Sequence, residues 1–210
     1  MSHPSSSIFT VLFVCTGNIC RSALAERLGR AFVDEELGAD AGRIRLISGG
    51  TQAVVGSGMH RDSALVLEGL GGDPAPFRAQ QLRSSQLDEA DLVLVMTSRH
   101  REAALGLSPR AMARTFLLRE AADLLQHYVP EAEVSGGEFT ERASALVAAM
   151  ARARGRRTPN ARDDVLDPIR RPLEVHEEVG EVIATALIPV LQRLVALVPE
   201  PDDLAAGRLG

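Results

Sequence analysis

The chain has 210 residues, which is enough for one well-buried core and short for two. Its hydrophobic content of 45% and charged content of 24% are ordinary for a globular domain and exclude a disordered or collagen-like chain. The net charge of −5 argues against a nucleic-acid partner, because phosphate backbones recruit clustered positive charge. The one basic cluster lies within 152–157, and we interpret it as a solvated helix end.

Short, almost continuously apolar runs alternate with helical patterns along the chain. Strands are expected at 8–14, 43–47, 91–96 and 114–118. Helices are expected at 22–37, 61–70, 99–105, 119–126, 138–154 and 173–198, the last bending at Pro189. Apolar strands that alternate with helices are typical of sheets covered on both faces. We therefore expect an α/β fold: a doubly wound, four-stranded parallel sheet flanked by helices on both faces.

The positions of the turn-forming segments, which are rich in Gly, Pro and Ser, favour one domain at 1–198, with a helical insertion at 131–162 and a C-terminal tail at 199–210. The segment 155–163 is rich in Arg, Pro and Asn and is expected to be a mobile surface loop. The start of the chain lacks the basic residues of a signal peptide, and the apolar run 182–198 is too interrupted to span a membrane. We expect no membrane partner, and the sequence leaves the oligomeric state open.

Eight residues that follow the first expected strand form the most informative motif. They are Cys15, Thr16, Gly17, Asn18, Ile19, Cys20, Arg21 and Ser22, and a helix is expected directly after them. Backbone N–H groups of such a loop converge on one point, and the helix dipole adds positive potential there, so we expect 16–22 to bind a phosphate. Arg21 can supply a planar, two-pronged donor. The same field favours a thiolate at Cys15, which indicates nucleophilic attack on phosphorus.

Both cysteines of the chain lie inside this motif. Their Cys-x4-Cys spacing, with no histidine nearby in sequence, fits no common zinc site, and we expect no metal and no organic cofactor. Secreted domains usually have cysteines spread along the chain as disulfide partners, and this chain does not, which favours a reducing, cytoplasmic location. Cys20 is interpreted as the partner in a reversible disulfide that protects Cys15 from over-oxidation, with a buried filler residue as the alternative.

With these residues in hand, the chain resembles the low-molecular-weight protein tyrosine phosphatases, in particular their longer actinobacterial members. The octet matches the family's loop, and three further segments follow in order: Ser48-Gly49-Gly50-Thr51, 90–96 and Asp167-Pro168. The resemblance covers 8–130 and 163–198. It implies a phosphate monoester hydrolase that acts on a phosphorylated protein or a small phosphate ester.

The resemblance also implies roles for single residues. Cys15 would form a phosphocysteine, Arg21 would hold the phosphate oxygens, and Asp167 would protonate the leaving oxygen and later activate water. Asp163 and Asp164 are rivals for the acid, and Asp167 is preferred because it alone precedes a proline.

Three further residues are expected to support the loop. Asn18 tolerates a left-handed backbone and would brace the loop. Ser22 can donate to the thiolate. Ser48 would tie the loop to the second strand, although a plain turn role suits it nearly as well.

The sequence departs from the family at the substrate rim. Ile169 stands where an aromatic residue is usual, Val54 lies where a tryptophan is common, and Phe77 replaces a histidine that braces the loop asparagine. Arg170, beside Ile169, would attract an acidic substrate. Because a substrate ring loses stacking partners, we expect weaker or altered phosphotyrosine selectivity.

Two other functions remain open at this point. One is a phosphate-binding pseudo-enzyme, and the other is an arsenate reductase that uses an external thiol. Asp167-Pro168 favours a phosphatase, because arsenate reduction needs no such general acid.

Overall fold

The computed structural model describes residues 8–130 and 137–199. Its centre is a parallel sheet of β1 (Phe9–Cys15), β2 (Ile44–Gly50), β3 (Leu92–Val95) and β4 (Thr115–Leu117). The strand order is β2-β1-β3-β4, so the chain winds from β1 to one side and returns to the other. The order reverses beside β1, which is where open α/β sheets bind ligands at the carboxyl ends of their strands. The expected doubly wound sheet is confirmed.

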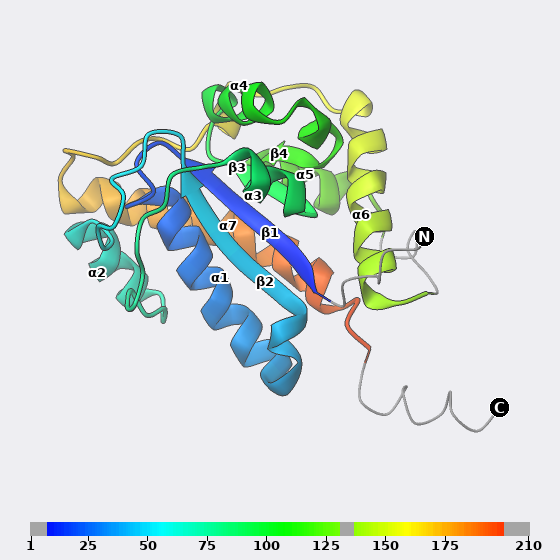
Figure 1. The fold of residues 1–210 in the computed structure, drawn as a ribbon, viewed down its shortest axis with the longest axis horizontal. Coiled ribbons are helices and arrows are strands. Elements are labelled where there is room, and N and C mark those ends of the chain that lie inside the picture. The colour runs from blue at the N-terminus through cyan, green and yellow to red at the C-terminus, as the bar shows by residue number, and fades with distance from the viewer. Residues whose placement is uncertain (1–7, 131–136, 200–210) are drawn as a thin grey trace.

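Seven α-helices surround the sheet in the described residues (Figure 1). They are α1 (Arg21–Leu37), α2 (Arg61–Gly69), α3 (Ser84–Glu89), α4 (Ser98–Leu107), α5 (Leu118–His127), α6 (Phe139–Ala153) and α7 (Leu173–Val195). Helix α3 was not expected. Helix α7 continues through Pro189 and ends three residues earlier than expected.

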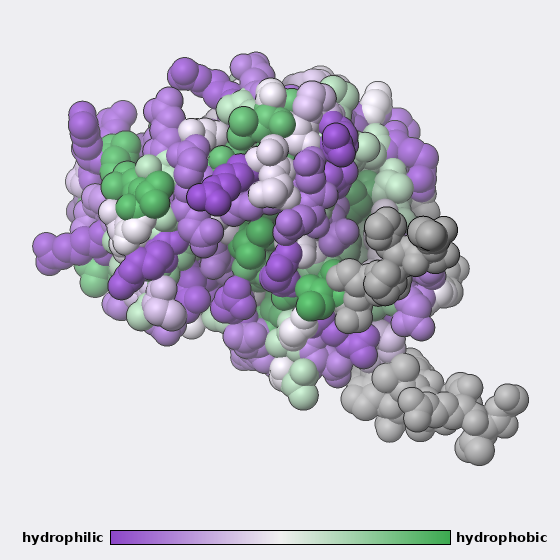
Figure 2. Space-filling view, in the orientation of Figure 1, coloured by the Kyte–Doolittle hydropathy of each residue, from purple (hydrophilic) through white to green (hydrophobic). Residues whose placement is uncertain are grey.

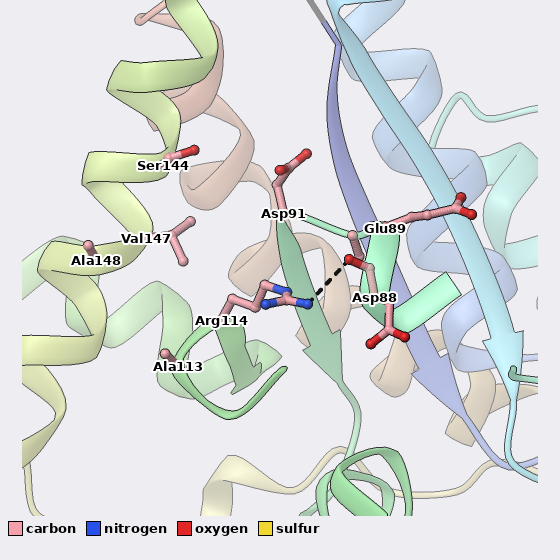
Figure 3. Close-up of a pocket in the computed structure, with 9 residues that line it drawn as sticks. Asp88, Glu89, Asp91, Ala113, Arg114, Ser144, Val147 and Ala148 are labelled. Carbon is pink, nitrogen blue, oxygen red and sulfur yellow. Dashed lines mark hydrogen bonds between the residues drawn. The ribbon is translucent and has the colours of Figure 1, made fainter. Parts of the chain in front are cut away.

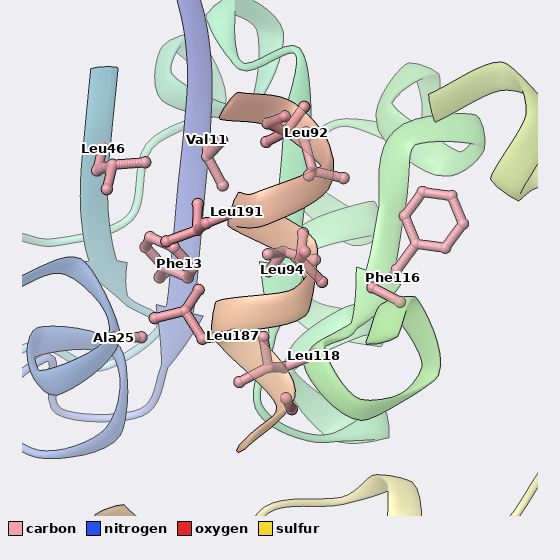
Figure 4. Close-up of a cluster of buried hydrophobic side chains, with 14 of the residues drawn as sticks. Val11, Phe13, Ala25, Leu46, Leu92, Leu94, Phe116, Leu118, Leu187 and Leu191 are labelled. Atoms are coloured by element: carbon pink, nitrogen blue, oxygen red, sulfur yellow. The ribbon is translucent and has the colours of Figure 1, made fainter. Parts of the chain in front are cut away.

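Alternation along β1 divides the core into two layers. Val11 and Phe13 face α1, α5 and α7, and Figure 4 shows them opposite Leu187 and Leu191 of α7. Their neighbours along the strand, such as Leu12, point to the other face and pack with α3 and α4. Because β1 is buried along its whole length, its end holds Cys15 in a fixed position.

Helix α6, in the described part of the expected insertion, extends the core. Its buried residues are Phe139, Ala143, Leu146, Val147, Ala149, Met150 and Ala153. The Phe139 ring packs edge-on against Phe9, with ring centroids 6.2 Å apart. The insertion's first residues, 131–136, and the expected tail from 200 onward lie outside the described residues. Figure 2 shows mostly hydrophilic side chains on one face of the molecule, and no described helix is long and apolar enough to cross a membrane.

The basic cluster at 152–157 is only partly a solvated helix end, because Arg152 and Arg156 are exposed whereas the other two arginines are half-buried. Arg154 lies over the Phe116 ring, 4.1 Å from its centroid, and its Nε donates to Glu120 at 2.9 Å. Arg157 donates from both terminal nitrogens to Asp163, each at 2.7 Å, and its Nε contacts Asp123 of α5. The contact with Asp123 connects the segment 155–163 to α5, and the mobility expected of that segment stays a prediction.

Candidate active site

The loop between β1 and α1 surrounds the sulfur of Cys15. Cys15 is the last residue of β1, where it pairs with Gly50 of β2, and α1 begins at Arg21. The Sγ atom lies 2.9 Å from Ser22 Oγ and accepts from the backbone N–H of Asn18 at 3.3 Å. The free N–H groups of the first turn of α1 lie beside the loop, as in other anion-binding helix starts.

Asn18 is the hub that holds this loop. Its backbone is left-handed, with φ of 54°, which asparagine tolerates better than most residues. Its Nδ2 donates to Ser22 Oγ at 2.9 Å and to Ser48 Oγ at 2.7 Å, and its Oδ1 accepts from Gln80 N at 2.7 Å. Ser48 in turn donates to Glu26 at 2.6 Å. The side chain of Asn18 therefore connects the loop to α1, to β2 and to the backbone at Gln80.

This hub explains one of the three departures from the family pattern. Phe77 stands where a histidine was expected, and it packs with Ala23 and Ala79 against α1. The brace on Asn18 comes instead from the backbone amide of Gln80. A backbone donor needs no particular side chain, so the sequence could not reveal it.

Arg21 connects the loop to the chain just before α7. Its side chain is buried, and its Nη1 donates to the Val165 carbonyl at 3.0 Å. Its Nη2 lies 2.6 Å from Asp167 Oδ2, while the Asp167 side chain remains 43% exposed. Among the described residues, Arg21 Nε has no hydrogen-bond partner. The Val165 carbonyl thus holds the guanidinium at Nη1, and the Asp167 carboxylate lies beside Nη2.

The two rival acids have other partners. Asp164 accepts from the backbone N–H of Ser98 at 2.7 Å and from its hydroxyl at 3.2 Å, so it caps the start of α4. Asp163 is buried in its two-pronged pair with Arg157. Asp167, by contrast, contacts Arg21 and lines the cavity in front of Cys15.

His100 is a site residue that the sequence did not reveal. It lies in α4, and its Nε2 is 2.9 Å from Thr16 Oγ1 while its Nδ1 is 2.9 Å from Thr97 Oγ1. Burial, helped by the charge of Arg21, lowers the pKa of His100 to about 4, so the ring is neutral at pH 7. The one available signal was its position shortly after the carboxyl end of β3.

A cavity of about 250 Å³ opens in front of the sulfur. It is lined by Cys15, Thr16, Gly17, Ile19, Cys20, Arg21, Gln52, Val54, Asp167 and Ile169. Val54 and Ile169 are 49% and 39% exposed, as expected of rim residues. Arg170 follows with a left-handed backbone, φ 60°, and does not line this cavity.

Burial raises the pKa of the Cys20 thiol to about 11.

A second pocket, of about 330 Å³, lies far from this chemistry (Figure 3). It is found near the amino end of β3, beside α6, and Asp88, Asp91 and Arg114 line it. Arg114 donates to the carbonyls of Leu87 and Asp88, and Asp91 accepts from Thr10 N at 2.8 Å. These charged groups hold the ends of elements together.

The strand–loop–helix cradle, with a thiol at its start and an arginine at its end, defines a cysteine-dependent phosphatase. Comparison with known families agrees with this class. The model of the low molecular weight phosphotyrosine protein phosphatases matches residues 10–141. The chain belongs to this family, and it is a phosphatase enzyme.

Individual relatives show how far the likeness extends. A low molecular weight protein-tyrosine-phosphatase of Streptomyces coelicolor is 36% identical over 139 residues, which cover 62% of this chain and 74% of that protein. A protein-arginine-phosphatase of Geobacillus stearothermophilus is 34% identical over 112 residues, 53% of this chain and 70% of its own length. The solved low molecular weight protein tyrosine phosphatase of T. tengcongensis has a TM-score of 0.62 at 26% identity, covering 88% of this chain and 98% of that chain.

Proposed function

We propose that this phosphatase hydrolyses phosphotyrosine in proteins, with Cys15 as nucleophile, Arg21 as phosphate ligand and Asp167 as general acid. One observation carries the assignment. The three side chains line the same cavity, and Asp167 contacts Arg21 at 2.6 Å, although Arg21 and Asp167 lie far apart in sequence. A nucleophile, an anion-binding donor and an acid within one small cavity are the groups that phosphoryl transfer from an ester requires.

In the first step, the substrate phosphate takes the place of Asp167 on the Arg21 guanidinium. The thiolate of Cys15 attacks phosphorus, so that a sulfur–phosphorus bond forms as the bond from phosphorus to the ester oxygen breaks. Once released from Arg21, the Asp167 carboxylate takes up a proton from solvent and donates it to that oxygen. The loop N–H groups and Arg21 hold the charge that develops on the other phosphate oxygens.

In the second step, water attacks the phosphocysteine. Asp167, now a carboxylate, takes a proton from the water, and the sulfur–phosphorus bond breaks to release phosphate. Charge returns to the Cys15 sulfur, where the Ser22 hydroxyl and the Asn18 N–H can donate to it. Asn18 and Ser48 act by holding the loop in place. Neither step calls for a metal or an organic cofactor.

The rim favours an aromatic substrate over a phosphoarginine side chain. Ile19, Val54 and Ile169 offer aliphatic walls that bury a phenyl ring without stacking on it. Of the described residues that line the cavity, Asp167 alone carries a carboxylate, and it is committed to Arg21 and to acid catalysis. Asp164 lines an adjoining cavity, but its carboxylate already accepts two hydrogen bonds from Ser98, so a substrate guanidinium would find no free counter-charge in the described cavity. We therefore expect a preference for phosphotyrosine that is modest. A thiolate enzyme of this kind suits the reducing cytoplasm, where we place it.

Turnover of four substrates by the purified protein tests this proposal, with Cys15→Ser as the control. The substrates are a phosphotyrosine peptide, a phosphoarginine peptide, a non-aromatic phosphate ester, and arsenate with an external thiol. We expect all phosphatase activity to vanish in the variant. We also expect phosphotyrosine to be preferred over the other two phosphates by about 10-fold, because burial of the ring contributes about 1.4 kcal/mol and this energy corresponds to a factor of about 10.

Other outcomes would replace the proposal. Phosphate binding without turnover would indicate a binding protein, and thiol-dependent arsenate reduction would indicate a reductase. A phosphoarginine preference would move the protein to the arginine phosphatases. Equal rates for all phosphates would show that the aliphatic rim does not select its substrate.

A further inference from the structure

Three potential metal ligands meet behind the phosphate-binding loop. Cys20 belongs to the loop, His60 precedes α2, and His176 lies in α7. Their ligand atoms all lie within 4.8 Å of one another. Cys20 and His176 are buried, His60 is half-buried, and the two imidazole rings stack with centroids 4.8 Å apart. This cluster could not be predicted from the sequence, because its members come from three distant segments.

His176 carries the observation that points to a ligand. Its side chain is 1% exposed, and its Nε2 has no hydrogen-bond partner among the described residues. Its Nδ1 lies 2.9 Å from Ser63 Oγ. Metal-binding histidines commonly have this arrangement, in which a partner on one ring nitrogen fixes the ring and leaves the other free. A buried nitrogen without a partner costs free energy that a bound cation would recover.

We propose that Cys20, His60 and His176 form a binding site for Zn²⁺ or a similar divalent ion, with a fourth position open to water. One thiolate and two imidazoles are a donor set that zinc accepts. Bond lengths of 2.0–2.3 Å place tetrahedral ligand atoms about 3.5 Å apart, so the ligand atoms need to approach by about 1 Å. The stacked rings of His60 and His176 also need to turn, because each ring binds an ion that lies in its own plane. On binding, a bond from zinc to sulfur replaces the Cys20 thiol proton, which passes to solvent.

Such an ion would act on the catalytic loop through its neighbour. Cys20 directly precedes Arg21, so the ion would join the end of the loop to α2 and α7. It would also withhold the Cys20 sulfur from a disulfide with Cys15. The site would therefore make the redox behaviour of the loop depend on zinc.

Cobalt titration of the Cys15→Ser variant tests the site, because Cys20 is then the single thiol of the chain. With a phosphine reductant present, we expect one Co²⁺ per chain, a sulfur-to-cobalt charge-transfer absorption and displacement by Zn²⁺. In the Cys15→Ser background, His176→Asn should weaken binding by more than about 10-fold, since even outer partners of a metal contribute that much. Because the variant cannot form a phosphocysteine, the result does not depend on the proposed catalytic function.

Two controls sharpen the result. His127→Asn, in the same background, removes an exposed histidine outside the cluster and should leave the affinity unchanged. His60→Asn changes a half-buried ligand and should weaken binding even if His176→Asn fails to fold. Absence of the charge-transfer band, or equal affinity in His60→Asn and His127→Asn, would overturn the proposal.

Discussion

Asp167 lines the active-site cavity and contacts Arg21, and its proposed role as an acid is open to a direct measurement. We predict that Asp167→Asn lowers kcat by about two to four orders of magnitude, because amide nitrogen cannot give its proton to a leaving oxygen. The loss should be larger for phenyl phosphate than for p-nitrophenyl phosphate, whose leaving group needs less protonation. Steady-state kinetics with both esters provide the measurement.

Asp164→Asn is the matched control for this substitution. Asp164 caps α4 through Ser98 and, within the described part of the chain, forms no hydrogen bond or ion pair with Arg21, so its loss should affect stability more than kcat. If Asp164→Asn were far more damaging to kcat than Asp167→Asn, the assignment of the acid would be wrong.

The protonation of His100 makes the free energy of unfolding depend on pH. Its pKa is about 4 in the folded protein, because of burial and the charge of Arg21, and about 6.5 in an unfolded chain. Between these values the unfolded chain binds a proton that the folded chain does not, so stability falls as the pH falls through this window. From pH 7 to pH 5, we predict a loss of about 2 kcal/mol attributable to His100.

Urea unfolding at pH 7 and pH 5 isolates this contribution. His100→Asn should lose less stability between the two pH values than the wild type, and His127→Asn, which changes an exposed histidine, should behave like the wild type. Equal losses in the wild type and His100→Asn would show that His100 is protonated in the folded protein.

The three proposed catalytic residues could be found from the sequence, whereas some of the groups that hold their loop in place could not. The octet and Asp167-Pro168 are local patterns, so the nucleophile, the phosphate ligand and the acid could be proposed from them. His100 and the amide of Gln80 touch the loop from segments far along the chain, and a backbone donor leaves no residue-type signal. A single sequence contains no direct information on such contacts.

At the scale of elements, the end of β2 limits how the catalytic loop can lie. A Cβ atom on Gly50 would come within 2.5 Å of the Thr16 carbonyl and 3.0 Å of Ala53 Cα, both backbone atoms. We predict that Gly50→Ala destabilises the fold by about 1–3 kcal/mol. It should also lower kcat/KM by up to about 100-fold, the usual result of displacing a reacting group by 1 Å.

Thermal unfolding and kinetics of the purified variant check both parts of this prediction. Gly58→Ala is a suitable control, because nothing lies within 4 Å of the added atom. Normal activity in Gly50→Ala would mean that the loop can move away from β2 without losing its geometry.

Element prediction succeeded where a continuous apolar run marked the element. All four strands were found to within about three residues, whereas α3 has six residues and completes too few turns to produce a helical period. Arg154 and Arg157 were misjudged for another reason. A charged side chain gives the same local signal in water and against Phe116, Glu120 and Asp163, so its burial depends on the tertiary fold.

At the scale of the molecule, α6 forms part of the same core as the sheet. Phe139 is 2% exposed and packs against Phe9 of β1. We predict that Phe139→Ala lowers the free energy of unfolding by about 3–5 kcal/mol, through lost burial and the cavity that remains. Urea denaturation followed by circular dichroism gives this value and shows whether one transition accounts for the whole signal.

Ser144→Ala, on the exposed side of α6, should change stability by less than about 0.5 kcal/mol. A small effect of Phe139→Ala, or a separate transition for α6, would instead mark α6 as an appendage that the phosphatase fold does not need.

The contact of Arg21 with Val165 joins residues separated by 144 positions, and this has a consequence for synthesis. The Cys15 loop is synthesised well before Asp167 and α7, the helix that packs on α1. A nascent chain therefore carries the proposed nucleophile before the proposed acid. We expect products of premature termination before α7 to be inactive.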